Sequence, residues 1–147
     1  MNRHLFLSTL IAAALAGAGA AWAQSAPPGS PAVVPLDTES GFGTLNVACT
    51  GIGQSKDDAR WKAYPIRLEF SNPGGDLLAN EAVTVSTRSG QTLATVSCEG
   101  PWILLRGTPG VYKVDAWLPG SGAKHQSGTF SMPASGLRIV SLRFAEP

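Results

Sequence analysis

Apolar and polar residues alternate along several short stretches of this 147-residue chain, and a period of two is typical of half-buried β-strands. The clearest alternating stretches are 66–70, 83–87, 112–118 and 140–144. Weaker strand candidates are 45–49, 93–98, 102–105 and 127–132. Turn-forming Gly, Pro, Asn and Ser residues separate the stretches, and the gaps are too short for the crossover helices of a parallel sheet. The pattern therefore predicts an all-β, antiparallel sandwich or barrel.

One short helical segment interrupts this pattern of strands. Ser55 is a candidate N-cap with Asp58 at the capping-box position, and Asp58 and Lys62 have the i, i+4 spacing of a weak surface ion pair. Pro65 disfavours helix at Tyr64 and favours the start of a strand after it. We therefore expect one short helical insertion between two strands.

The first 23 residues resemble a secretory signal peptide. Arg3 and His4 precede a short apolar run, and small residues then lead to Ala21-Trp22-Ala23, an A-x-A cleavage pattern. A membrane anchor is the alternative, but the run is shorter than the roughly 20 apolar residues that cross a bilayer. We expect residues 1–23 to be cleaved, with no membrane span in the product. The periplasm is the expected location, and the extracellular space is the alternative.

The expected domain begins after a Pro-rich segment. Residues 24–40 contain four prolines with Ser, Ala and Gly and show no sustained period, which predicts a flexible linker. The folded domain is expected to span residues 41–147. The chain holds 11 basic and 10 acidic residues, and removal of Arg3 with the leader leaves 10 of each. This balance argues against nucleic acid as a partner, because nucleic-acid binders carry a basic surface.

Both cysteines, Cys49 and Cys98, lie in the expected mature chain. An oxidising compartment favours a disulfide between them, and two buried thiols are the alternative. A metal site is a weaker alternative, because C-x-x-C spacing is absent and His125 is the one histidine of the mature chain. We expect a disulfide and no metal or other cofactor.

The sequence contains no convincing catalytic constellation. His125 follows a Gly-rich turn, and no G-x-S-x-G motif accompanies it. Ser121 and Lys124 match S-x-x-K, but Gly122 disfavours the helix that this motif requires, and its partner motifs are absent. Asp57 and Asp58 are adjacent, so on a helix their side chains diverge by about 100°. We therefore expect a protein without enzymatic activity and assign no catalytic residue.

The tryptophans are the better candidates for ligand or partner contact. Trp117 has the polar phase of its strand, together with Lys113 and Asp115, and a tryptophan on a solvated sheet face can stack on a sugar or contact a protein. The favoured alternative is that the helical segment of Trp61 covers Trp117 in a small separate core. Trp102 is expected in the main core, near Cys98. Trp61 and Trp117 are thus the candidate contact residues.

Several motifs resemble a group of small exported bacterial proteins. They are Gly51-Ile52-Gly53, Tyr64 followed by the strand 66–70, Gly100-Pro101-Trp102, and the Pro-Gly-x-Tyr-x-Val pattern at 109–114. Together they resemble the carboxypeptidase regulatory-like domains, a branch of the transthyretin-like (prealbumin-like) β-sandwiches. The resemblance implies an immunoglobulin-like antiparallel sandwich of about seven or eight strands that is not itself catalytic.

Hydroxyisourate hydrolases are transthyretin-like enzymes, and this chain differs from them. They end in a Tyr-Arg-Gly-Ser motif and use several histidines, whereas this chain ends Leu142-Arg143-Phe144-Ala145-Glu146-Pro147. A hydrolase is therefore disfavoured. We expect a non-catalytic binding or accessory module with an unidentified protein or glycan partner in the periplasm. The alternative is recognition of carbohydrate or cell wall through exposed aromatics such as Trp117.

Overall fold

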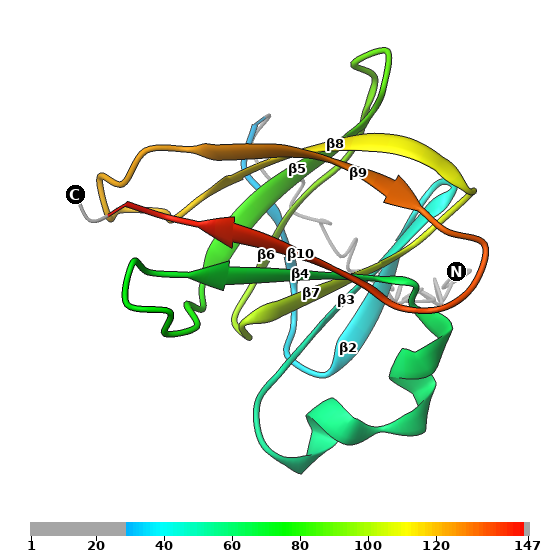
Figure 1. Ribbon diagram of the computed structural model, residues 1–147, viewed down its shortest axis with the longest axis horizontal. Helices are drawn as coiled ribbons and strands as arrows, with labels where there is room; N and C mark the ends of the chain where they lie inside the picture. Colours follow the sequence, from blue (N-terminus) through cyan, green and yellow to red (C-terminus); the bar gives the residue numbers. More distant parts are fainter. Residues whose placement is uncertain (1–28, 146–147) are drawn as a thin grey trace, which may run out of the picture.

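The computed structural model describes residues 29–145, and within this range ten β-strands form two five-stranded sheets that pack face to face (Figure 1). Sheet A has the order β1-β6-β5-β8-β9, and sheet B has the order β10-β4-β7-β3-β2. The strands are β1 (Ala32–Val34), β2 (Thr38–Phe42), β3 (Leu45–Thr50), β4 (Ile66–Ser71), β5 (Glu81–Thr87), β6 (Thr92–Cys98), β7 (Trp102–Arg106), β8 (Gly110–Trp117), β9 (Gln126–Met132) and β10 (Arg138–Arg143). The predicted all-β sandwich is confirmed.

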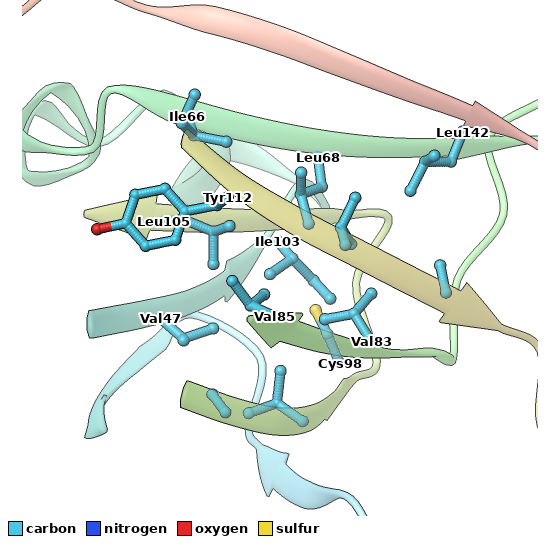
Figure 2. Close-up of a cluster of buried hydrophobic side chains, with 14 of the residues drawn as sticks. Val47, Ile66, Leu68, Val83, Val85, Cys98, Ile103, Leu105, Tyr112 and Leu142 are labelled. Atoms are coloured by element: carbon cyan, nitrogen blue, oxygen red, sulfur yellow. The ribbon is translucent and has the colours of Figure 1, made fainter. Parts of the chain in front are cut away.

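The alternating residues form the core between the two sheets. In β4, Ile66, Leu68 and Phe70 are fully buried, and the polar residues between them are only partly buried. Figure 2 shows valines of sheet A meeting aliphatic side chains of sheet B in the space between the layers. The strands that the period of two predicted, both the clear and the weak candidates, are present. Burial of their inward faces is the main source of stability for such a sandwich.

The sheets are mixed, whereas the sequence predicted an antiparallel sandwich with fewer strands. The strand β1 pairs in parallel with β6, and β10 pairs in parallel with β4. Each of these parallel strands lies at the edge of its sheet. The strand β1 lies at the start of the described chain and β10 at its end, and each is far in sequence from the strand with which it pairs. No tight hairpin joins either pair, so an antiparallel direction is not required.

The folded part also begins earlier than the predicted boundary at residue 41. The strand β1 and the first three residues of β2 lie in the segment predicted to be a linker, and Val34 is completely buried in the core. Pro31 and Pro35 flank β1, a position that suits proline because the strand is at a sheet edge. Residues 1–28, which include the expected signal peptide and the start of the linker, lie outside the described range.

The predicted helical insertion is present as two 3₁₀ turns, Gln54–Asp57 and Ala59–Ala63, drawn in green beside sheet B (Figure 1). Asp58 has an extended backbone between them, and its carboxylate accepts a hydrogen bond from the Arg60 amide at 3.0 Å. Ser55 is not the N-cap that was predicted, and Asp58 pairs with Arg60 rather than with Lys62. Tyr64, before Pro65, ends the turn in an extended conformation as expected. Within residues 29–145, no helix has the length and apolar character needed to span a membrane.

The predicted disulfide between Cys49 and Cys98 is present. Cys49 belongs to β3 and Cys98 to β6, so the bond joins sheet B to sheet A through the core. The amide of Gly100 donates a hydrogen bond to the Cys49 sulfur at 3.4 Å. This contact and the disulfide together hold the turn between β6 and β7 against the end of β3.

Candidate functional site

Trp61 and Trp117 lie on opposite sides of the sandwich. Trp61 is buried with Ala48, Tyr64 and Leu104 against the outer face of sheet B. Trp117 ends β8, a central strand of sheet A, in the phase opposite to the buried core residues. The interpretation that the segment of Trp61 covers Trp117 is therefore wrong. The reason is topological, because the helical insertion connects β3 to β4 and both of these strands belong to sheet B.

Trp117 forms an aromatic pair with His125. Their ring centroids are 5.4 Å apart and their planes differ by 9°. Atoms of stacked rings in contact are separated by about 3.5–4.0 Å, so a centroid distance of this size means that the two rings are offset. Part of each ring face therefore extends beyond the other ring. The pair forms an aromatic surface at one end of sheet A.

Asp115 holds two neighbouring side chains beside this pair. The Ser127 hydroxyl donates to Asp115 Oδ1 at 2.7 Å, and His125 Nδ1 lies 2.8 Å from Asp115 Oδ2. Ser127 and His125 both bond to the carboxylate, and no hydrogen bond joins them to each other. In a Ser-His-Asp triad the histidine lies between the serine and the carboxylate. This arrangement orients polar groups but does not activate the serine.

A shallow groove of about 340 Å³ continues from Asp115 across the outer face of sheet A. Hydroxyl groups dominate its polar lining, and one ammonium and one carboxylate group accompany them. These residues are Thr84, Ser86, Ser127, Thr129, Lys113 and Asp115. We call this surface, with Trp117 and His125, the sheet A face. The groove contains the side chains on the solvent phase of β5, β8 and β9, where strand alternation places them.

A second concavity, of about 390 Å³, lies on the outer face of sheet B beside the helical insertion. We call it the sheet B pocket. Its apolar lining includes Trp61, Trp102, Leu104 and Leu137. Trp102 is partly exposed, and the prediction that it belongs to the main core is wrong. In β7 the main-core phase is occupied by Ile103 and Leu105, so Trp102 has the outward phase.

Asp37 fixes the insertion that carries Trp61. Its carboxylate accepts hydrogen bonds from Ser55 at 2.6 Å and from Thr50 at 2.7 Å, and these two bonds lower the pKa of Asp37. Arg60 donates to the Asp37 carbonyl at 2.9 Å. The Trp61 indole donates to the Ser55 carbonyl at 2.7 Å. One loop residue therefore connects the insertion to the edge of sheet B and thereby helps to position Trp61.

Tyr64 also lines the sheet B pocket. Its hydroxyl donates a hydrogen bond to the Glu39 carboxylate. Burial is the main cause that raises the pKa of the Tyr64 hydroxyl, and the hydrogen bond to Glu39 raises it further. The guanidinium of Arg106 lies 4.9 Å from the centroid of the Tyr64 ring. Tyr64 is thus held between β2 and β7, and it forms a rigid base for the sheet B pocket.

Glu81 is a buried acid that the sequence analysis did not identify. It is completely buried, and neither carboxyl oxygen has a hydrogen-bond partner. Desolvation raises the pKa of Glu81 to about 8. Its phase could have been found in the sequence, because Glu81 alternates with the inward-facing Val83 and Val85. The sequence also did not predict the contact between the Arg67 guanidinium and the Trp102 ring, because this contact depends on the pairing of β4 with β7.

Neither a metal site nor a similarity to known proteins assigns a function to this chain. Among residues 29–145, no group of three or more His, Cys, Asp or Glu side chains is placed to hold a metal ion. No protein-family model and no curated protein match the chain. The carboxypeptidase regulatory-like family therefore remains a prediction from the motifs.

Proposed function

We propose that the chain is a non-catalytic binding module of the periplasm that recognises a glycan through the sheet A face. The observation that carries this proposal is the Trp117–His125 stack beside the Asp115–Ser127 pair. Sugar rings present apolar C–H faces together with hydroxyl groups that both donate and accept hydrogen bonds. The sheet A face offers an aromatic surface on which the C–H face of a sugar can stack, and fixed polar groups that can bond to its hydroxyl groups.

The polar groups of this face suit hydroxyl recognition. Asp115 accepts hydrogen bonds, Lys113 donates them, and Thr84 and Ser127 can do both. Thr84 already bonds to the Thr95 hydroxyl at 3.0 Å, so its orientation is restricted before a ligand arrives. Such preorganisation lowers the entropic cost of binding. The face lies on regular strands, which hold these side chains in register.

The number of carboxyl groups in the groove of the sheet A face supports binding of a glycan without hydrolysis. Glycoside hydrolysis generally uses two carboxyl groups on either side of the scissile bond. Among residues 29–145, Asp115 is the one carboxylate that lines the groove of the sheet A face, and it already accepts a hydrogen bond from Ser127. This supports a role for Asp115 as a hydrogen-bond acceptor rather than a general acid.

The proposal is tested by calorimetric titration of the mature chain with soluble peptidoglycan fragments and with neutral oligosaccharides. Trp117→Ala should weaken binding by about tenfold or more, because stacking and buried ring area are both lost. Asp115→Asn should also weaken it. Glu99→Gln removes an exposed carboxylate that lines neither concave surface and should leave the affinity unchanged. Wild-type protein that binds none of these glycans, or a Trp117→Ala variant with unchanged affinity, would overturn the proposal.

A further inference from the structure

We propose that the sheet B pocket is a second, separate binding site, and that its ligand is an organic carboxylate with an apolar body. The pocket lies across the sandwich from the sheet A face. Its walls come from the helical insertion, from β4 and β7, and from the turn before β10. These elements are far apart in the sequence, so the pocket exists only in the folded chain.

The apolar part of the ligand is indicated by the floor and rim of the pocket. Trp61 and Leu104 are buried and form part of a small hydrophobic cluster there. Leu137 stands at the pocket with 58% of its surface exposed, so it adds an uncovered apolar surface to the rim. The volume of about 390 Å³ exceeds the roughly 150 Å³ of a cavity that holds benzene. A ring with a short polar chain is therefore an appropriate size.

The acceptor part of the ligand is indicated by two N–H groups that have no acceptor. Arg67 Nε and Trp102 Nε1 are both buried and unpaired, and both side chains line the pocket. The Arg67 guanidinium lies 4.1 Å from the centroid of the Trp102 ring, so the two groups are close together. Each can only donate, and a buried donor without a partner is unfavourable. An oxygen atom of a bound ligand would supply the missing acceptor once the Arg67 and Trp102 side chains turn their N–H groups toward the pocket on binding.

The charges around the pocket favour an anion. Lys56 Nζ lies 3.4 Å from Asp57 Oδ2, and Arg67 Nη2 lies 2.8 Å from Glu69 Oε1, so these cations are matched by carboxylates. The carboxylate of Asp58, which also lines the pocket, is matched by Arg60 Nε at 3.4 Å. Lys62 also lines the pocket, and no carboxylate of the described residues lies within 4.0 Å of its ammonium group. The unmatched charge at the pocket is therefore positive. A carboxylate could accept from the unpaired N–H groups while its charge is attracted to Lys62.

The same carboxylate chemistry has two sources, which are a free small molecule and the C-terminus of a peptide. Calorimetric titration with phenylacetate tests the first source, and titration with the tripeptide Gly-Gly-Phe tests the second. Phenylacetamide and the C-terminal amide of the same tripeptide are the matched neutral ligands. Binding of either acid at least about fivefold tighter than its amide supports the proposal and identifies the source, because a charged hydrogen bond is worth more than a neutral one.

Variants locate the binding. Lys62→Gln should weaken binding of the acid severalfold without affecting the amide, and Leu137→Ala should weaken binding of both. Arg88→Gln removes another exposed cation, from the turn between β5 and β6, and should have no effect. Trp117→Ala should also have no effect, which separates this site from the glycan proposal. Absence of binding by both acids, equal affinity for acid and amide, or an unaffected Lys62→Gln variant would overturn the inference.

Discussion

Glu81 and Cys98 are register partners across β5 and β6, and both side chains are buried inside the sandwich. The carboxyl group therefore lies in the core on the strand next to the disulfide, where it has no hydrogen-bond partner. No charged group contributes to its raised pKa, which is caused by loss of water around the carboxyl group. The protein thus carries a buried acid that is neutral when folded near pH 7.

This burial predicts that stability decreases as the pH rises from about 4.5 to about 8. Over this range the unfolded chain releases the Glu81 proton, whereas the folded chain keeps it until its pKa of about 8. The folded state then binds more protons, so the free energy of unfolding falls with pH, by at most about 1.4 kcal/mol per pH unit for one group. Urea denaturation at several pH values measures this slope.

Glu81→Gln should remove this pH dependence, because the amide does not titrate. Glu99→Gln, an exposed substitution at the end of β6, is the matched control and should keep the slope. Identical pH profiles for wild-type protein and Glu81→Gln would show that Glu81 is already ionised in the folded state at low pH.

Removal of the disulfide should lower stability without changing the fold. The two cysteines are separated by 49 positions, and the chain-entropy model gives about 4 kcal/mol for a loop of this length. Cys49→Ala combined with Cys98→Ala should therefore unfold at a clearly lower urea concentration. Because both residues are buried, folded wild-type protein should resist mild reductant, which a thiol count before and after denaturation measures. Rapid reduction of the native protein would contradict the buried position of the bond.

Replacement of the two tryptophans should have different effects on stability. Trp61→Ala removes a buried ring and the hydrogen bond to Ser55, so we expect a loss of about 3–5 kcal/mol. Trp117→Ala changes a partly exposed side chain and should cost less than about 1 kcal/mol. Chemical denaturation of both variants measures the difference. Equal losses would contradict the burial of Trp61 against sheet B and the position of Trp117 on the sheet A face.

Gly100 should not tolerate a side chain. A Cβ atom at this position would lie 2.3 Å from the carbonyl oxygen of Thr50, which belongs to the backbone and cannot move aside easily. Gly100→Ala should therefore destabilise the turn beside the disulfide by more than about 2 kcal/mol. Gly41→Ala is the control, because the nearest atom to its added Cβ is 3.6 Å away. Similar thermal midpoints for the two variants would contradict this close approach.

Local patterns in the sequence were sufficient for much of the fold. The alternation of Ile66, Leu68 and Phe70 with polar residues identified both a strand and its buried face, because a strand has the same period wherever it lies. Pro65 marked the end of the helical insertion for an equally local reason. The Cys49–Cys98 pair followed from the presence of two cysteines in a chain expected to be exported. These features depend on residues close in sequence or on composition.

Strand pairing over long distances was decided only by the tertiary structure. Val34 lies in the core because β1 pairs with β6, where its register partner is Cys98, more than sixty residues later in the chain. No local sequence pattern distinguishes such an edge strand from a linker. Periodicity gives the phase of Trp117 but not the sheet that carries it. Arg67 and Trp102 meet because β4 pairs with β7, and the insertion before β4 places Trp61 beside Trp102. By itself the sequence determined that β3 to β10 are strands and, where the alternation is clear, which side of the strand is buried, since both follow from backbone geometry. Only the packed structure decided which faces became pockets, since this depends on contacts between residues far apart along the chain.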